Sequence, residues 1–252
     1  MKRLLKKIET FARDLRPGQT DQRRFPEATA ADLRNMASVR EFTMTSQERL
    51  WALVSAVRYV EGRNLEGDYV ECGVWRGGSI MTAALTLIEL GVRTRDIWLF
   101  DTFEGMSKPT AEDVSLKDGR HAGEKWLATR TGDDSAAWCD AGIDEVARNV
   151  ARTGYPRERL RFVKGKVEDT LRDTDHLPGR IALLRLDTDW YASTKAEMEV
   201  LFPRLVAGGV LILDDYGHWA GSKQAVDEYF ASHGLHYLLN RTDRAGRMMI
   251  KD

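Results

Sequence analysis

Cysteine is scarce in this sequence, with two residues, Cys72 and Cys139, among 252. Two cysteines do not make the disulfide framework of a small secreted domain, so the chain fits a reducing compartment and we expect it in the cytoplasm. Cys72 falls within an apolar run, which favours a core position over a reactive one. No apolar segment approaches the length of a membrane span and no signal-peptide pattern opens the chain, so we expect no membrane contact.

A surplus of one charge sign is also missing, because 38 basic residues stand against 39 acidic ones. This balance excludes a general polyanion binder, and we expect no nucleic-acid partner. The hydrophobic content of 42% is enough for a sizeable core, and the length suits one large α/β domain. We therefore expect a single domain over residues 1–252, with an N-terminal helical or lid region over 1–60.

Residues 2–16 have apolar side chains at helical spacing, with lysine and arginine on the other side. We expect this helix to pack on the protein body or on a second subunit rather than on a membrane surface, because Glu9 and Asp14 interrupt the basic face. A further helix is predicted after a cap at Thr45 or Ser46.

The charged segment over residues 105–140 is too long for an ordinary connection inside a compact domain. Segments of this kind are typically functional lids or mobile inserts. It contains His121, Lys125, Trp126 and Trp138, for which we expect packing within the lid or exposure to solvent more than contact with a substrate.

The stretch over residues 181–216 has two short apolar runs, each of which ends in a pair of acids. The run 181–186 leads into Asp187-Thr188-Asp189, a helix is predicted from about 192 to 203, and after Gly208-Gly209 the run 210–213 leads into Asp214-Asp215. Short apolar runs of this kind are typical of parallel strands buried on both faces. The stretch therefore predicts a strand–helix–strand unit.

The acids of this unit should meet in space. Parallel strands have their C-terminal ends at one edge of the sheet, where open α/β sheets bind ligands. Four carboxylates in one crevice repel one another unless a cation is present, so a divalent metal with oxygen ligands is expected. Asp187 and Asp189 would share a face if their strand continued, whereas Asp214 and Asp215 could reach one ion only if theirs had already turned.

A glycine turn follows the first predicted strand, residues 68–72, in the sequence GVWRGGS, and a helix is predicted over 79–90. Glycines let the backbone approach a ligand, and a helix N-terminus offers free N–H groups. The spacing is not the dinucleotide pattern G-x-G-x-x-G. Glu71 precedes the turn. The second strand is predicted over residues 97–100 and ends in Asp101, which could hold ribose hydroxyls or simply cap a turn.

The remaining elements complete a mixed sheet of about seven strands. We predict a helix over 144–153, a third strand over 160–163, a helix over 222–232, and two late strands over 235–239 and 248–251 joined by a turn over 240–246.

The glycine turn, the acid placed to hold a ribose (Asp101) and the acid cluster together suggest a class I S-adenosylmethionine methyltransferase. Five pieces resemble the macrocin O-methyltransferase family of sugar O-methyltransferases in antibiotic biosynthesis. They are YVECGVWRGGS (69–79), LFDTFEGM (99–106), VKGKVEDTL (163–171), LRLDTDWYAST (184–194) and GGVLILDDYG (208–217). The pieces cover most of residues 69–217 in the family's order. The N-terminal region and the insert match less clearly, so we expect substrate choice to reside there.

The resemblance implies a Rossmann-like sheet of order 3-2-1-4-5-7-6, bound S-adenosylmethionine, Mg²⁺, a small-molecule glycoside substrate and a homodimer or higher homo-oligomer. It also implies roles by position: Asp189 as the general base; Asp187, Asp214 and Asp215 as metal ligands; Glu71, Gly73, Val74, Gly77 and Ser79 at the methionine end of the cofactor; Asp101 and Phe103 at the ribose; Val167 and Glu168 at the adenine. His218 and Tyr191 are further candidates for substrate contact.

Several alternatives stay open at this point. The acceptor could be a phenol or catechol rather than a sugar. Asp187-Thr188-Asp189 is a D-x-D pattern, which can bind metal and a nucleotide sugar in a glycosyltransferase, although the glycine turn argues against that. The glycine spacing also disfavours an NAD-dependent oxidoreductase. A binding protein without catalysis would have no use for the complete set of acids.

Overall fold

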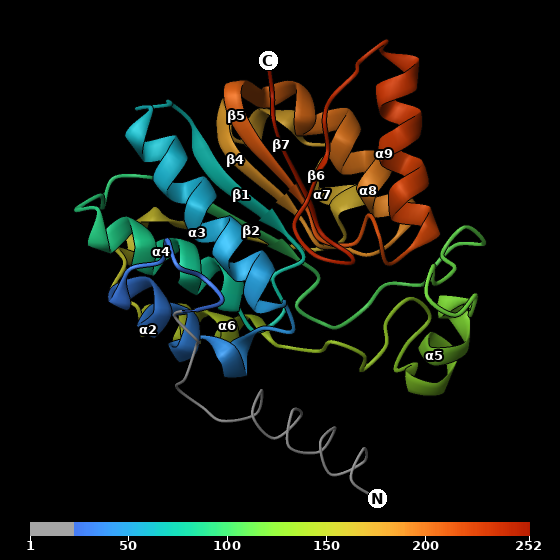
Figure 1. Ribbon diagram of the computed structural model, residues 1–252. Coiled ribbons are helices and arrows are strands. Elements are labelled where there is room, and N and C mark those ends of the chain that lie inside the picture. The colour runs from blue at the N-terminus through green and yellow to red at the C-terminus, as the bar shows by residue number, and fades with distance from the viewer. Residues whose placement is uncertain (1–22) are drawn as a thin grey trace, which may run out of the picture.

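The computed structural model describes residues 23–252, and the helix predicted over residues 2–16 lies outside them. A seven-stranded sheet forms the centre of the described part, with helices on both of its faces (Figure 1). The strands are β1 (Asp68–Cys72), β2 (Ile97–Asp101), β3 (Leu160–Lys164), β4 (Ile181–Leu186), β5 (Leu205–Leu213), β6 (Asn240–Arg241) and β7 (Arg247–Ile250). Their order, β3-β2-β1-β4-β5-β7-β6, confirms the predicted one.

Strands β1 to β5 pair in parallel, and β7 runs antiparallel to both β5 and β6. All six residues of β4 are buried, as expected for a central parallel strand covered on both faces. Because β1, β4 and β5 are adjacent and parallel, the segments that follow them emerge at one edge of the sheet.

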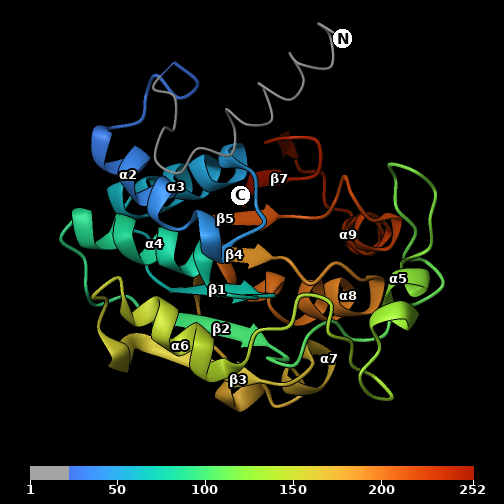
Figure 2. The ribbon, with the colours of Figure 1, turned by 90° about the horizontal axis from the view of Figure 1, so that it is seen from below.

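Helices cover the sheet in two layers (Figure 2). One layer contains α2 (Ala30–Ser38), α3 (Gln47–Gly62), α4 (Gly78–Glu89) and α6 (Ile143–Ala151); the other contains α7 (Val167–Thr170), α8 (Tyr191–Val200) and α9 (Ala220–Ser232). Each layer closes its own core: Leu53 and Leu87 pack with Leu183 on one face, whereas Met198 and Phe230 pack with Leu184 on the other. Alternation along β4 thus sends neighbouring side chains to different cores.

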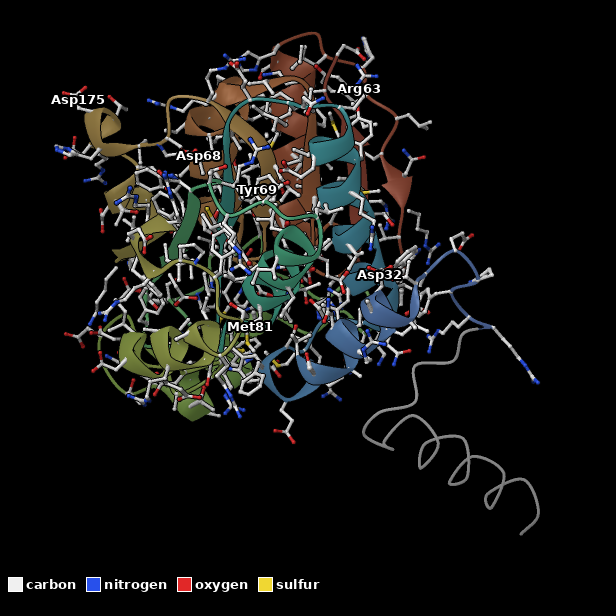
Figure 3. All side chains as sticks on the ribbon, turned by 90° about the vertical axis from the view of Figure 1, so that its left-hand side faces the viewer. Asp32, Arg63, Asp68, Tyr69, Met81 and Asp175 are labelled. Carbon is white, nitrogen blue, oxygen red and sulfur yellow. The ribbon has the colours of Figure 1, made fainter. Side chains whose placement is uncertain are left out.

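Hydrogen bonds and an ion pair at the start of α2 stabilise the first helical layer. Thr29 caps this helix: its hydroxyl accepts from the Asp32 N–H at 3.1 Å, and the Asp32 carboxylate accepts from the Thr29 N–H at 2.9 Å. Asp32, which is labelled in Figure 3, also pairs with Arg58 of α3 at 2.6 Å. Ser46 caps α3 by accepting from the Arg49 N–H at 3.2 Å, which confirms one of the two predicted caps. These contacts join α2 to α3 and define where α3 begins.

Two predicted boundaries in the central unit were wrong. Strand β5 begins at Leu205 and passes through Gly208 and Gly209, which we had expected to lie before the strand. Gly208 has a φ of +79°, and the β4–β5 register shifts here, so the strand continues through a bulge. The predicted helix ends earlier, at Val200, and gives way to a 3-10 turn over Phe202–Arg204.

The predicted strand over residues 235–239 was also wrong. The chain pairs as β6 only at Asn240–Arg241, inside the segment predicted as a turn. Tyr237 lies 5.4 Å from the ring of Phe230 and 6.0 Å from that of Phe202, measured between ring centroids. Packing of this ring over α9 therefore takes the place of regular strand pairing.

Candidate active site

A cavity of about 260 Å³ lies at the C-terminal edge of the sheet. Its lining comes from the turn after β1, the end of β2, the segments after β4 and β5, the start of α3 with the segment before it, and the insert. The lining includes Glu71, Gly73, Val74, Ser79, Asp101, Asp187, Asp189, Asp214, Asp215, Met44, Thr45, Arg49, Trp138, His218 and Trp219. A second hollow of about 60 Å³ shares Gly73, Asp101 and Asp187 with it and extends to Val167 and Glu168.

Three carboxylates converge in the larger cavity. Strands β4 and β5 end at Leu186 and Leu213, one residue before the acids, so both chains have left strand geometry where the acids begin. One oxygen each of Asp187, Asp214 and Asp215 lies within 4.8 Å of the other two. The condition for Asp214 and Asp215 to reach a common ion is thereby met.

Asp189 does not continue the strand pattern. Its φ is +70°, in the left-handed region that non-glycine residues seldom adopt. The strand does not continue to Asp189, so Asp189 does not share a strand face with Asp187. The chain makes a tight turn there instead. In this turn the Asp189 carboxylate still faces the cavity, where its Oδ1 accepts a 2.7 Å hydrogen bond from the Trp219 indole.

Two arginines lie among the acids. Arg185, the penultimate residue of β4, has a side chain that is 3% exposed, and it donates to Glu71 at 2.6 Å, Asp187 at 2.8 Å and Asp214 at 2.5 Å. Arg49 of α3 pairs with the other oxygen of Asp214 and with Asp243 at 3.1 Å. These guanidinium groups neutralise part of the negative charge and fix the Asp214 carboxylate between them.

The carboxyl groups that face the cavity are strongly perturbed. Burial raises the pKa of Glu71 to about 7, although Arg185 opposes the rise. Burial, reinforced by the charge of Asp187, raises the pKa of Asp189 to about 8. Burial likewise raises the pKa values of Asp187 and Asp215 well above the usual range. Desolvation and crowding both favour neutral acids, and a bound cation would favour the carboxylates instead.

The donor set fits a divalent ion. Carboxylate oxygens are the ligands that Mg²⁺ and Ca²⁺ prefer. The Oδ2 atom of Asp215 is buried and has no hydrogen-bond partner within the described residues, although buried polar atoms are normally satisfied. An ion contacted by this atom would satisfy it.

The glycine turn after β1 lies against the acid segment. Gly73 has a φ of +82°, and a β-carbon there would come within 2.1 Å of the Asp187 carbonyl oxygen. Asp101 accepts from the backbone N–H groups of Val74 at 2.6 Å, Trp75 at 3.0 Å and Phe103 at 2.7 Å. Its carboxylate therefore shapes the turn, as a capping residue would, and it also lines both cavities.

Some predicted residues lie apart from the cavities. Gly77 is the N-cap of α4, with a φ of +90°, and a β-carbon there would press on Val146 and Val150. Phe103 is 3% exposed and packs near Phe162. Neither residue lines either cavity, so the structure gives them supporting positions.

The two candidates for substrate contact are placed differently. His218 lines the larger cavity. Tyr191 does not, and its hydroxyl donates to Glu228 of α9 at 2.8 Å.

The insert over residues 105–140 packs against the acid segments through tryptophan. Trp138, Trp190 and Trp219 form a cluster with ring centroids 5.2 to 6.2 Å apart. The Lys125 ammonium lies 3.9 Å from the centroid of Trp138. His121 caps α5 (Ala122–Thr129) by accepting from the Gly123 N–H. The insert therefore forms one wall of the cavity.

Sequence reasoning missed Arg185, Arg49, Trp219 and Glu197. Glu197 of α8 is fully buried and accepts from the Thr188 hydroxyl at 3.0 Å beneath the acid turn, and burial raises its pKa well above the usual range. A signal was available for Arg185, because a charged residue inside an apolar strand requires buried partners. Nothing in the local sequence marks the distant Arg49 or Trp219.

The strand order and the cavity over the glycine turn are those of a class I methyltransferase. The family model for macrocin-O-methyltransferase (TylF) matches residues 4–251. This chain belongs to that family, and it is an S-adenosylmethionine-dependent O-methyltransferase, as predicted.

Proteins that are similar in sequence or in structure agree with this family assignment. The 8-demethyl-8-(2,3-dimethoxy-alpha-L-rhamnosyl)-tetracenomycin-C 4'-O-methyltransferase of Streptomyces olivaceus is 34% identical over 81% of this chain and 73% of its own. The demethyldecarbamoylnovobiocin O-methyltransferase of Streptomyces niveus is 35% identical over the same shares. The structure of the O-methyltransferase NovP superposes with a TM-score of 0.71 at 32% identity, covering 83% of this chain and 82% of NovP.

These findings remove three alternatives. A D-x-D glycosyltransferase and an NAD-dependent oxidoreductase are both incompatible with the family, as is a binding protein without catalysis. Among residues 23–252, the structure has no helix whose length and apolar character would let it cross a bilayer.

Proposed function

We propose that this O-methyltransferase transfers the methyl group of S-adenosylmethionine to a sugar hydroxyl of a glycosylated natural product, with Mg²⁺ as the metal. The observation that carries the proposal is the convergence of Asp187, Asp214 and Asp215 beside the glycine turn, with Asp189 facing the same cavity. The relatives named above support the acceptor class, because two of their names specify a rhamnosyl group and a novobiocin precursor. A third relative, from Micromonospora griseorubida, is named mycinamicin III 3''-O-methyltransferase.

The cofactor would lie across both cavities. We propose that Glu71, Gly73, Val74 and Ser79 contact its methionine part, Asp101 its ribose, and Val167 and Glu168 its adenine. The close approach of Gly73 to Asp187 brings this turn next to the acids. The sulfonium methyl would then face the acceptor hydroxyl, and such positioning accounts for much of the rate in reactions of this kind.

The acceptor needs activation, because an alkyl hydroxyl has a pKa close to that of water. Asp187, Asp214 and Asp215 would hold the ion, which, when bound, lowers the pKa of an oxygen that contacts it. Asp189 would accept the hydroxyl proton. S-adenosylmethionine, when bound, would supply the methyl group: the acceptor oxygen would gain the bond to the methyl carbon, and the sulfur would leave as a neutral thioether. Trp138 and Trp219 would exclude water from this step.

A panel of acceptors tests the proposal. The protein is incubated with S-adenosylmethionine and Mg²⁺ and with demethyldecarbamoylnovobiocin, mycinamicin III, the rhamnosyl tetracenomycin or catechol, and the products are analysed by mass spectrometry. We expect methylation of at least one glycoside at a sugar hydroxyl. Methylation of catechol alone, or of a phenolic position, would contradict the proposed acceptor class.

We further propose that the protein acts as a homodimer or higher homo-oligomer, an expectation that rests on the family resemblance, and that it acts in the cytoplasm, which its low cysteine content favours. Light scattering coupled to size-exclusion chromatography measures the assembled mass, and a monomer at micromolar concentration would contradict it.

A further inference from the structure

The Asp189 side chain needs a hydrogen-bond partner that fixes its orientation. Its left-handed backbone, with a φ of +70°, releases the side chain from the alternation of β4. Conformations of this kind persist at functional sites when the surroundings hold them in place. The indole N–H of Trp219 donates to the Oδ1 atom of Asp189 at 2.7 Å, from a residue 30 positions further along the chain.

Trp219 is itself held firmly. Its side chain is almost wholly enclosed, with 7% of the residue exposed. Its ring lies edge-on to Trp190 at 5.2 Å and to Trp138 at 6.2 Å between centroids. Its backbone N–H donates to the Asp215 carbonyl at 3.0 Å. The indole therefore has one orientation, in which its N–H points at Asp189.

The insert holds this tryptophan by backbone pairing. Ser115 forms an antiparallel bridge with Trp219. On either side, the Ala220 N–H donates to the Val114 carbonyl at 2.9 Å and the Leu116 N–H donates to the His218 carbonyl at 2.8 Å. The segment 113–116 thus runs as a short extra strand beside the chain that follows Asp215.

The same segment also reaches the chain that follows Asp189. The Asp113 carboxylate is buried and accepts from the Tyr191 N–H at 2.8 Å. Gly221 packs so closely that a β-carbon there would come within 2.1 Å of the Asp113 Oδ1 atom. One stretch of the insert therefore connects both acid segments.

We propose that Trp219 is a positioning residue for methyl transfer: its indole N–H holds the Asp189 carboxylate towards the acceptor hydroxyl, and residues 113–116 of the insert hold Trp219. The inference rests on the proposed role of Asp189 as the base. It gives the insert a part in the chemistry besides covering the cavity. Trp219 acts through Asp189 and need not touch the substrate.

The test removes the hydrogen-bond donor and keeps an aromatic side chain. Trp219→Phe removes the N–H, and we expect kcat to fall about 10- to 100-fold, as for a misplaced catalytic group. The KM values for S-adenosylmethionine and for the best glycoside of the panel should change less than about twofold, since no binding group is lost. A wild-type kcat in Trp219→Phe would overturn the proposal.

Trp98→Phe is the matched control. Trp98 also donates its indole N–H to a carboxylate, that of Asp68, at 2.9 Å. Asp68 starts β1, and Figure 3 shows it well apart from Met81 in the first turn of α4, the helix whose Ser79 lines the cavity. The control should keep kcat within about twofold. An equal loss of kcat in both variants would assign the effect to general packing and overturn the proposal.

The single variants Asp189→Asn and Trp219→Phe separate the inference from its basis. An active Asp189→Asn protein would refute the base assignment, while an inactive Asp189→Asn with a fully active Trp219→Phe would refute only the positioning role.

A crystal structure of Trp219→Phe with S-adenosylhomocysteine provides a readout that does not require turnover. We expect the Asp189 carboxylate to turn away or to occupy more than one rotamer. An unmoved carboxylate would overturn the proposal.

Discussion

Arg185→Met should be one of the most destabilising single substitutions in the sheet. Its guanidinium donates to Glu71, Asp187, Asp214 and the Thr45 hydroxyl, and its side chain is 3% exposed. Methionine has a similar length, so the main change is loss of charge and of hydrogen bonds. Removing one partner of a buried ion pair costs about 3–5 kcal/mol, and because three carboxylates lose their partner we expect the upper part of that range.

Urea unfolding followed by circular dichroism measures this free energy, with EDTA present so that divalent ions do not replace the lost charge. Arg180→Met is the matched control, because it lies just before the same strand and pairs with Glu66 in solvent, where the two side chains are 61% and 77% exposed. Exposed pairs of this kind contribute about 0–1 kcal/mol.

A second variant tests the cause of the loss. Glu71→Gln removes one of the carboxylates that Arg185 neutralises, so the double variant with Arg185→Met should be more stable than the sum of the single changes predicts. Additive losses, or an Arg185→Met protein as stable as Arg180→Met, would refute the view that Arg185 is the counter-charge of the acid cluster.

Three further outcomes follow from the structure. Asp189→Asn should abolish methyl transfer while calorimetry still detects S-adenosylhomocysteine binding, and retained turnover would contradict the base assignment. Gly73→Ala should lower the free energy of unfolding by at least about 2 kcal/mol, because its φ is +82° and its β-carbon would meet the Asp187 carbonyl; a neutral effect would contradict that close approach. Burial favours a raised pKa for Asp32, but hydrogen bonds from Arg58 and Thr29 outweigh it and hold the pKa below its usual range. Asp32→Asn should therefore cost about 1–2 kcal/mol at neutral pH, with the difference from wild type shrinking as the pH falls from about 5 towards 3; a pH-independent difference would contradict this linkage.

The strand order could be predicted because its determinants are local or follow from family resemblance. Apolar runs bounded by Gly and Asp mark β1, β2 and β4, and each was located to within a residue. The prediction for the final hairpin was wrong because Tyr237 packs against rings from two other elements. Such contacts produce no periodic pattern in the sequence. The predicted start of β5 was wrong because a strand with a bulge tolerates glycines, which usually mark the end of a strand.

The acid cluster was predictable for a different reason. Asp187, Asp214 and Asp215 each follow a parallel strand, and parallel pairing alone brings such positions together. What surrounds them was not predictable, because Arg49 comes from a helix 165 residues before Asp214 and pairs with it across the cavity. The hydrogen bond from Trp219 to Asp189 depends on two turns whose geometry no short motif determines.

Metal dependence tests the central claim most directly. Methyl transfer to the best glycoside of the panel is measured after treatment with EDTA and then during titration with Mg²⁺, for the wild type and for Asp215→Asn. We predict that EDTA abolishes turnover, that Mg²⁺ restores it, and that Asp215→Asn requires a much higher Mg²⁺ concentration or stays inactive. Full turnover in EDTA, or an Asp215→Asn protein with the wild-type Mg²⁺ dependence, would contradict the claim that these aspartates hold a catalytic cation.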